Sequence, residues 1–509
     1  MKGKFYESEY EKALIDLLQA EGWQYTNGGN IHRQLREPLL IEDPKVNDLR
    51  VYLQNQYPDL ADSDVTEVIN YLRHVPGQSH FERLRNTFQL VRDGYRYTRH
   101  GDGVNFDIRF IDFDNTDCNI FRAVNQFEVA YGMKNDVRIP DVLLFVNGIP
   151  LCIFELKNPT KLDADIAQAY EQIHTRYMRD IPHLLRYCPL SCISDATDNN
   201  TRLGTTYTPY EHYYAWKKVN NEDPSAQKGI DQVRTIVKGV HEPSRFLEIL
   251  RDYVYFPDEK SGREEEIVCR YPQFFATRMM SDSIRRAFKE QTSKGGTYFG
   301  ATGCGKTYTM MFIARQLALR CKELGSPTVI MIVDRDDLQT QAGKLFLRSQ
   351  DFLQLGTVKV ISDREELKTE LSLRDSGGFF ICTIQKFCES IGELNTRRNI
   401  ICFSDEAHRT QIRLSSKIKV VEHKDIEAKV EQTSAGAVAV RIIDESKIGA
   451  FVTKPYAEQL RTAFPNATFV GFTGTPIAET IQVFGEIVDR YTMQQAVDDE
   501  ITKDIKYIP

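Results

Sequence analysis

Two acidic side chains and one lysine fall near the ends of a short apolar segment of the 509-residue sequence. The segment, Ile139 to Asn158, reads IPDVLLFVNGIPLCIFELKN and contains Asp141, Glu155 and Lys157. Two carboxylates and a backbone carbonyl can bind Mg²⁺, which keeps water ligands and accepts phosphate oxygens. A metal beside an ammonium group can generate hydroxide and stabilise the extra charge of a phosphodiester transition state. These residues therefore predict a site for metal-dependent cleavage of nucleic acid.

A β-hairpin would bring the three residues together. Asn147-Gly148 favours a two-residue turn, and strands paired around it would have partner numbers that sum to roughly 295 to 297. Asp141 would then face the stretch from Phe154 to Leu156, beside Glu155, and Lys157 would share the face of Glu155. An exposed strand end with a solvated Glu/Lys pair would have the same residues. The hairpin alone therefore leaves two interpretations open, a metal site and an ordinary surface strand.

A second chemistry is indicated between Gly300 and Thr307, where GATGCGKT matches the pattern G-x-x-x-x-G-K-[ST]. Glycines in this pattern let backbone N–H groups surround the phosphates of a nucleotide, Lys306 reaches the β and γ phosphates, and Thr307 binds Mg²⁺. A chance Gly-rich turn is the alternative, but an apolar strand before the motif and a helical run after it favour ATP binding. The expected phosphate-binding positions are Gly300, Thr302, Gly303, Gly305, Lys306 and Thr307.

An acidic pair follows another apolar strand, IICFS, in the motif DEAH. Asp405 is expected to hold the Mg²⁺ of the nucleotide, and Glu406 to orient or deprotonate the attacking water. The motif GFTGTP follows at Gly471 to Pro476. A P-loop, DEAH and TGTP in this order predict an ATPase rather than three unrelated loops.

The elements that must position these motifs are strands and helices in alternation. After Glu266, short apolar strands are expected at 297–299, 328–333, 357–362, 379–384, 400–404 and 468–472, with helices from Lys306 and near Leu338. Alternation of this kind predicts an α/β fold with a parallel sheet covered on both faces. Ligands of such sheets bind at the carboxyl ends of the strands, where every motif above lies.

The N-terminal part has a different pattern. A helix is expected at the start of the chain, a strand at 104–113, and a helix at 163–180 with Ile166, Tyr170, Ile173 and Tyr177 on one face. The hydrophilic stretches 194–205 and 256–266 are interpreted as connections, and the second is the better domain boundary. The predicted organisation is therefore an N-terminal domain at 1–255, a linker at 256–266, a P-loop domain at 267–490, and a connecting segment at 491–509.

Composition limits the function class. The net charge of -7 means that any surface for nucleic acid must be a local basic patch. No apolar run approaches the roughly 18 residues of a membrane span, and the first residues lack a secretory signal, so no membrane association is expected. The ten cysteines show no CxxC pair and no Cys/His spacing typical of zinc sites, which favours a reducing cytoplasm over a disulfide framework.

The P-loop region resembles the DEAD/DEAH-like motor core of helicase superfamily two, a RecA-like fold. The resemblance implies that Gln273, in CRYPQ, reads adenine, and that His408, Thr473 and Thr475 couple hydrolysis to DNA movement. The segments implied to contact a DNA strand are VDRDDLQTQ at 333–341 and TIQKF at 383–387. Such motors bind ATP between two RecA-like domains, and no arginine motif of a second one follows Pro476. We therefore expect a chain truncated after its first motor domain, which binds ATP but turns it over poorly.

The hairpin resembles the PD-(D/E)xK restriction-endonuclease signature. An N-terminal domain of that kind joined to the motor is similar to the restriction (R) subunit of type I restriction-modification enzymes. This resemblance assigns catalysis and Mg²⁺ binding to the hairpin acids and implies a supporting acid at Glu11, with Glu9 as the alternative. Gln172 and Tyr177 resemble a Q-x-x-x-Y motif that is one residue longer here, so Tyr177 is equally consistent with a core position.

The family implies a complex in which methyltransferase (M) and specificity (S) subunits recognise a site, while the R subunit pulls in double-stranded DNA with ATP and cuts it. Three alternatives stay open. A type III restriction subunit normally carries its nuclease after the motor, whereas Asp141 precedes Lys306 here. A repair or remodelling translocase would have an inactive N-terminal domain, and a binding module would need neither ATP nor metal. The insertion between Arg409 and Phe464 has no predicted role.

Overall fold

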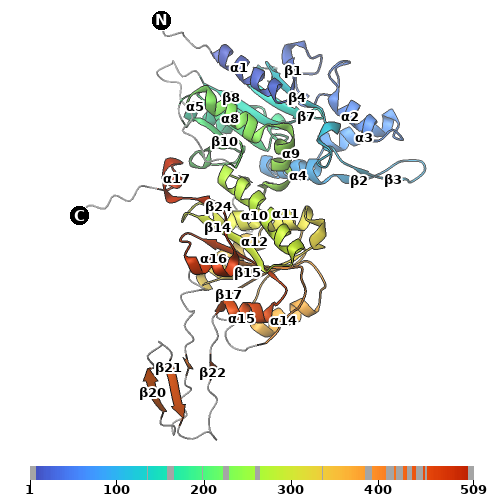
Figure 1. The fold of residues 1–509 in the computed structure, drawn as a ribbon. Helices are drawn as coiled ribbons and strands as arrows, with labels where there is room; N and C mark the ends of the chain where they lie inside the picture. The colour runs from blue at the N-terminus through green and yellow to red at the C-terminus, as the bar shows by residue number, and fades with distance from the viewer. Residues whose placement is uncertain are drawn as a thin grey trace. The chain divides into compact units, whose positions relative to one another are not determined.

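The computed structural model describes residues 7–134, 136–157, 166–195, 197, 199–221, 228–257, 264–334, 336–383, 392–407, 418–419, 428–432, 438–442, 451–452 and 456–502. Contacts divide the chain into two compact units (Figure 1). One comprises Met1–Phe275 and Asp498–Lys503, and the other Ala276–Val497 and Asp504–Pro509. Among the described helices, none is both long enough and apolar enough to cross a membrane.

A seven-stranded mixed sheet forms the centre of the first unit, in the order β1-β4-β7-β8-β9-β10-β11. The pairs β1/β4 and β8/β9 are parallel, and the other pairs are antiparallel. The strands are β1 Gln24–Asn27, β4 Phe121–Asn125, β7 Val142–Val146, β8 Ile149–Leu156, β9 Leu190–Ser194, β10 Thr201–Gly204 and β11 Tyr214–Ala215. Both β7 and β8 are buried along their whole length, as a central pair in a covered sheet requires.

Helices and small ribbons complete this unit. The helices are α1 Glu7–Ala20, α2 Asp48–Gln56, α3 Asp62–Arg73, α4 His80–Asp93, α5 Ile166–Glu171, α6 Met178–Asp180, α7 Pro182–Leu185, α8 Ile230–Val240 and α9 Pro243–Asp252, with a π-helix at Gln172–Tyr177. Two-stranded ribbons pair β2 Tyr95–Thr98 with β3 Asn105–Ile108, β5 Val129–Tyr131 with β6 Asp136–Arg138, and β12 Val254–Tyr255 with β13 Ile267–Val268. The predicted N-terminal helix is confirmed by α1.

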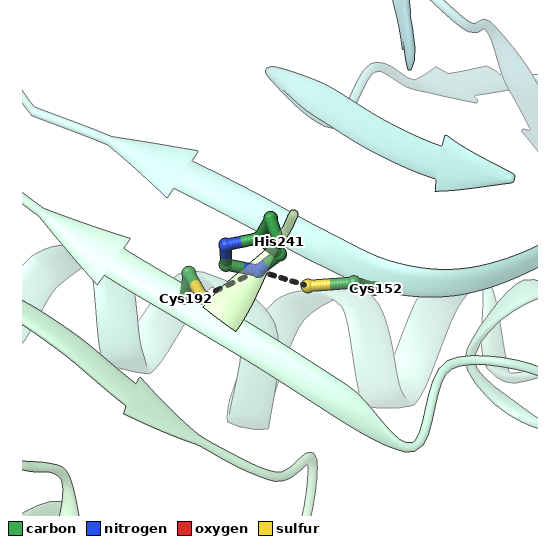
Figure 2. A group of neighbouring side chains, drawn as sticks. All are labelled: Cys152, Cys192 and His241. Atoms are coloured by element: carbon green, nitrogen blue, oxygen red, sulfur yellow. Dashed lines mark hydrogen bonds between the residues drawn. The ribbon is translucent and has the colours of Figure 1, made fainter. Parts of the chain in front are cut away.

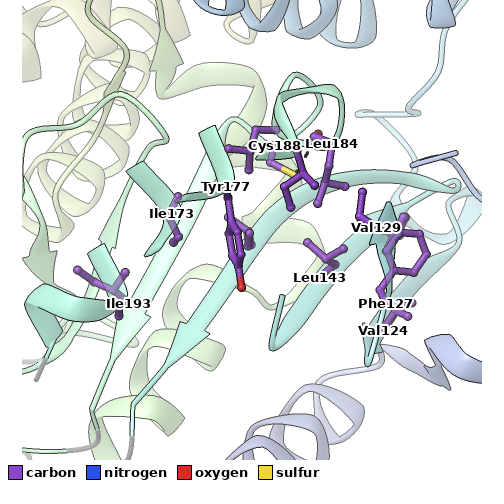
Figure 3. Packing of buried hydrophobic residues seen from close by; sticks show 14 of the residues in the cluster. Val124, Phe127, Val129, Leu143, Ile173, Tyr177, Leu184, Cys188 and Ile193 are labelled. Atoms are coloured by element: carbon purple, nitrogen blue, oxygen red, sulfur yellow. Dashed lines mark hydrogen bonds between the residues drawn. The ribbon is translucent and has the colours of Figure 1, made fainter. Parts of the chain in front are cut away.

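The helical segment after β8 packs one apolar face on the sheet (Figure 3). Ile173 and Tyr177 from this segment join Leu143 of β7 and Ile193 of β9 in one buried cluster. The predicted helical face is confirmed, although a π-helical turn replaces part of the expected α-helix. The apolar spacing of three and four residues thus fixes which side of this segment faces the strands.

The β7–β8 hairpin has the predicted turn and register. Asn147 and Gly148 have φ values of 49° and 75°, and Val142 pairs with Phe154, which gives the predicted sum of partner numbers. A Cβ on Gly148 would lie 2.7 Å from the Leu49 backbone nitrogen, so only glycine fits. The Asn147 side chain accepts a hydrogen bond from the Ile120 N–H at 2.8 Å, which anchors the turn to the residue that precedes β4.

Two N-terminal predictions differ from the structure. The strand expected at 104–113 is limited to β3, Asn105–Ile108. The interpretation of 194–205 as a connection is wrong, because β10 pairs antiparallel with β9 inside that stretch. The hydroxyls of Ser194 and Thr201 lie 2.7 Å apart in this pairing. Pairing with a buried neighbour therefore outweighs the polar composition of the segment.

The second unit contains a seven-stranded sheet in which every pair is parallel, in the order β16-β17-β15-β18-β23-β14-β24. The strands are β14 Lys294–Gly300, β15 Thr328–Val333, β16 Val358–Val360, β17 Phe379–Thr383, β18 Ile400–Ser404, β23 Thr468–Thr473 and β24 Ile487–Tyr491. The helices are α10 Tyr271–Glu290, which begins in the first unit, and α11 Lys306–Leu319, α12 Asp336–Leu347, α13 Gln350–Leu353, α14 Arg364–Ser372, α15 Tyr456–Ala463, α16 Ala478–Phe484 and α17 Met493–Asp498. The predicted α/β class and parallel sheet are confirmed.

The insertion after DEAH contributes two further ribbons. They pair β19 Ile418–Lys419 with β22 Phe451–Val452, and β20 Ala428–Gln432 with β21 Val438–Ile442, both antiparallel.

Candidate active sites

The end of the β7–β8 hairpin brings Asp141, Glu155 and Lys157 together. The Asp141 carboxylate accepts a hydrogen bond of 2.6 Å from the Leu156 N–H. The Lys157 ammonium lies 2.7 Å from Glu155 Oε1 and donates to the Leu156 carbonyl at 3.1 Å. The Lys157 N–H donates to the Ser194 carbonyl at 2.8 Å, so the lysine is held against the neighbouring strand β9. The hairpin thus juxtaposes two carboxylates, one ammonium and one carbonyl.

Glu155 has an unusual environment for an acid. Its side chain is completely buried, and burial, reinforced by the charge of Asp141, raises its pKa to about 8 although Lys157 opposes this effect. A carboxyl group of this kind is costly to ionise unless a positive charge compensates it. The site therefore favours a proton or a cation beside Glu155.

Tyr177 contacts this acid. Its hydroxyl donates to Glu155 Oε2 at 3.1 Å and lies 3.3 Å from the Ile139 carbonyl. Gln172 donates from Nε2 to the same hydroxyl at 2.7 Å. The π-helix Gln172–Tyr177 accommodates the extra residue of the motif, since its turn is wider than that of an α-helix. Tyr177 is consequently both a core residue and a neighbour of the candidate site.

Glu11 contacts the strand that pairs with the first strand of the hairpin. Glu11 on α1 accepts a hydrogen bond from the Asn125 amide, and Asn125 is paired with Val142, the residue after Asp141. Glu9 is exposed to solvent. Asn125 belongs to no sequence motif. Its place beside the hairpin follows only from the pairing of β4 with β7.

The P-loop connects β14, which ends at Gly300, to α11, which begins at Lys306. Gly303 and Gly305 have φ values of 84° and 86°, which turn the backbone around the loop. The Lys306 ammonium donates to the Gly300 carbonyl at 3.3 Å and lies 3.7 Å from Glu406 Oε1. The exposed Thr302 lies in the loop, and Thr307 is the second residue of α11.

The acidic pair follows β18. The Asp405 N–H donates to the Ile332 carbonyl at 2.9 Å, and Glu406, with a φ of 48°, donates its N–H to Asp405 Oδ1 at 3.0 Å. Burial and the charge of Glu406 raise the pKa of Asp405 to about 6, while Lys306 opposes the shift. Two carboxylates beside one lysine again form a site that a cation would stabilise.

The TGTP motif lies at the same edge of the sheet. The Thr475 N–H donates to Thr473 Oγ1 at 3.1 Å, and a Cβ on Gly474 would lie 3.4 Å from Thr302 Oγ1. The motif therefore packs on the P-loop. His408 and residues 384–387 lie outside the described residues, so their predicted roles stay predictions.

Gln273 belongs to the first unit. It is buried, and its side-chain oxygen accepts a hydrogen bond from the Arg270 N–H at 2.9 Å. Its adenine-reading role stays a prediction.

Comparison with known proteins finds matches for both the N-terminal region and the P-loop region. Residues 4–212 match the family described as type I restriction enzyme R protein N terminus, and residues 272–509 match the SWI2/SNF2 ATPase family. The chain is 33% identical to the type I restriction enzyme HindI endonuclease subunit of Haemophilus influenzae, covering 98% of this chain and 46% of that protein. It is 26% identical to the putative type I restriction enzyme MjaIXP endonuclease subunit of Methanocaldococcus jannaschii, covering 96% of this chain and 44% of that one.

The chain thus spans about half the length of the curated relatives it matches. Among solved structures, it is similar to the Sulfolobus solfataricus SWI2/SNF2 ATPase core in complex with dsDNA, at 11% identity and a TM-score of 0.24, covering 41% of this chain and 33% of that one. That similarity is low, and the assignment depends on the sequence relatives. The chain thus has a region that matches the N terminus of type I restriction enzyme R proteins, followed by a region that matches SWI2/SNF2 ATPases, and it is similar to type I restriction enzyme endonuclease subunits over nearly its whole length.

Proposed function

We propose that this chain acts as the motor and nuclease part of a type I restriction enzyme, which moves along double-stranded DNA with ATP and cleaves it with Mg²⁺. The observation that carries the proposal is the convergence of Asp141, Glu155 and Lys157 at one hairpin end, in a chain that also contains a P-loop and DEAH at one sheet edge. Relatives named as type I restriction enzyme endonuclease subunits match nearly the whole chain, across both regions.

The nuclease site suits Mg²⁺ on chemical grounds. Its donors are hard oxygens, the preferred ligands of Mg²⁺, and the raised pKa of Glu155 indicates a buried carboxyl group that a cation would stabilise. Asp141, Glu155 and the Leu156 carbonyl would hold the ion, which supplies an activated water and accepts phosphate oxygens when bound.

The surrounding residues have separate roles in the proposal. Lys157 would leave Glu155 and place its ammonium beside the phosphate that gains charge during cleavage. Tyr177 would hold Glu155 Oε2 in place through its hydroxyl, and Gln172 would fix that hydroxyl. Glu11 would support the site through Asn125. The hairpin thus supplies the reacting groups and the helices keep them aligned.

The P-loop edge suits the Mg²⁺ complex of ATP. Lys306 would exchange the Gly300 carbonyl for the β and γ phosphates, and Thr307 and Asp405 would hold the metal of the nucleotide. Glu406 would orient the attacking water. Thr473 and Thr475, together with His408, would transmit hydrolysis to DNA movement, and Gln273 would read adenine. The domains proposed from sequence, 1–255 and 267–490, assign these two chemistries to separate parts of the chain.

Sequence selection would come from other chains. We propose methyltransferase and specificity subunits as partners, because the related proteins are type I restriction enzyme subunits. A cytoplasmic location is consistent with the nine free cysteines among the described residues, since oxidising compartments favour disulfides.

Substitutions in the assembled enzyme, with the complete R chain and both partner subunits, test the proposal. Lys157→Ala should lower DNA cleavage by about a hundredfold or more while ATP hydrolysis continues, because the transition-state cation is lost and the motor is intact. Lys306→Ala should abolish both activities. Lys134→Ala is the matched control, since this exposed lysine lies in the first unit, between β5 and β6, and belongs to neither candidate site.

Normal cleavage by the Lys157→Ala enzyme would show that the hairpin is not the nuclease site. ATP hydrolysis without any cleavage by the wild-type complex would favour a repair or remodelling translocase with an inactive N-terminal domain.

A further inference from the structure

Three potential metal ligands converge inside the first unit, although they are far apart in sequence (Figure 2). Cys152 Sγ lies 3.8 Å and Cys192 Sγ lies 3.7 Å from His241 Nε2. All three ligand atoms lie within 4.8 Å of one another, and all three side chains are completely buried. Their spacing in the chain matches no zinc motif, which is why sequence inspection does not detect them.

The two cysteines lie on adjacent parallel strands and share a face. Cys152 pairs with Leu190, and Cys192 pairs with Phe154, so the sulfurs are offset by two residues along the strands. Strand spacing and rise put their Cα atoms about 8 Å apart. A disulfide spans roughly 4.4 to 6.8 Å between Cα atoms. The pair is therefore poorly placed for a disulfide, and Figure 2 shows the imidazole between the two sulfurs.

His241 is held in one orientation. Its N–H donates to the Val237 carbonyl at 2.9 Å, and its own carbonyl accepts from the Trp23 indole at 2.6 Å. Its Nδ1 lies 3.2 Å from the Ile236 carbonyl. Because a carbonyl can only accept, Nδ1 carries the proton and Nε2 presents its lone pair to both sulfurs. Metal-binding histidines are oriented in this way by a backbone carbonyl.

The distances suit a thiolate-binding metal. Zn²⁺ binds sulfur at about 2.3 Å and imidazole nitrogen at about 2.0 Å, so tetrahedral angles require sulfur and nitrogen to be about 3.5 Å apart. The observed separations of 3.8 and 3.7 Å need only a small adjustment.

Charge also favours a divalent ion. The rings of Phe154 and Phe246 lie 4.9 and 5.7 Å from the imidazole, so the pocket is apolar. Two thiolates and one divalent cation have no net charge, which suits such a pocket.

We propose that Cys152, Cys192 and His241 bind one Zn²⁺ ion as a structural site. Among the described residues no fourth cysteine, histidine or carboxylate joins the group, so a backbone oxygen or a water completes the coordination. The ion fastens the segment after α8 to β8 and β9. Because β8 also carries Glu155 on its opposite face, the zinc site supports the sheet that positions the nuclease hairpin.

The test is the metal content of the chain, purified from cells in ordinary medium and dialysed against chelator. About one zinc per chain is expected in the wild type, as a site coupled to folding retains its ion. Cys192→Ala should contain less than about a tenth of that amount. The matched control is Cys188→Ala, which removes another completely buried cysteine of this unit whose thiol donates to the Pro150 carbonyl at 3.4 Å.

If Cys192→Ala does not fold, two measurements on the wild-type protein still test the proposal. X-ray absorption at the zinc edge should give two sulfurs near 2.3 Å and a nitrogen near 2.0 Å, and refolding with Co²⁺ should give thiolate-to-cobalt absorption bands. Wild type without zinc and without cobalt bands, or zinc bound through oxygen and nitrogen alone, would overturn the proposal. Equal zinc in the Cys188→Ala and Cys192→Ala proteins would overturn it as well.

Discussion

The raised pKa of Glu155 predicts a specific loss of stability with pH. The pKa of this buried acid rises from 4.5 to about 8 in the folded chain, so the folded chain keeps a proton that the unfolded chain releases. The contribution of Glu155 to the free energy of unfolding should therefore be highest below pH 4.5, fall as pH rises toward 8, and level off above it. Between pH 4.5 and 8 this contribution should fall by roughly 5 kcal/mol, at about 1.4 kcal/mol for each pH unit.

Glu155→Gln isolates this contribution. The amide cannot ionise but retains an oxygen that can accept from Lys157 or Tyr177. The difference in unfolding free energy between the two proteins should change across the interval by up to about 5 kcal/mol, while contributions from other groups cancel.

Tryptophan fluorescence during urea unfolding in EDTA measures this difference at several pH values. The chain has two tryptophans, Trp23 and Trp216, and both are buried in the first unit, so the signal reports on the unit that contains Glu155. Added Mg²⁺ should stabilise the wild type near pH 8 and leave Glu155→Gln unchanged. A difference between the two proteins that is constant with pH would refute the reasoning.

Three further predictions concern the hairpin and the P-loop. Tyr177→Phe removes the donor to Glu155 Oε2 and should raise the Mg²⁺ concentration needed for cleavage by about tenfold, the value of one hydrogen bond, with ATP hydrolysis unchanged; an unaltered Mg²⁺ dependence would contradict this role. Gly148→Ala should lower the unfolding free energy by about 2 to 5 kcal/mol, because its Cβ would meet the Leu49 backbone at 2.7 Å and its φ of 75° also strains an alanine. Gly101→Ala has open space and a φ of 109°, so it should cost only the backbone strain, about 1 to 2 kcal/mol, in the same fluorescence assay. The chain should bind ATP with Mg²⁺, as measured by calorimetry, and Lys306→Ala should weaken that binding because the ammonium beside the phosphates is lost; equal binding by the two proteins would disagree.

The sequence was most informative where local rules determine geometry. Asn147-Gly148 predicts the turn, and the turn determines the register that places Asp141 against Leu156. The P-loop and DEAH follow strands at one sheet edge, as alternation of strands and helices requires. Short-range pattern is thus sufficient for the hairpin and for the parallel sheet.

Features that depend on distant contacts were not predictable. The polar segment that becomes β10 is a strand only because β9 pairs with it. The spacing of Gln172 and Tyr177 appears one residue too long until the π-helix is seen. Asn125 and the cluster of Cys152, Cys192 and His241 depend on tertiary pairing that no motif records.

The most direct test of the proposed nuclease site is a crystal of this chain grown with Mn²⁺ and measured at a wavelength where manganese scatters anomalously. The account predicts a peak bonded to the carboxylates of Asp141 and Glu155, with the Lys157 ammonium moved away from its 2.7 Å contact with Glu155. An intact contact between Glu155 and Lys157, with no peak within bonding distance of either acid, would contradict it.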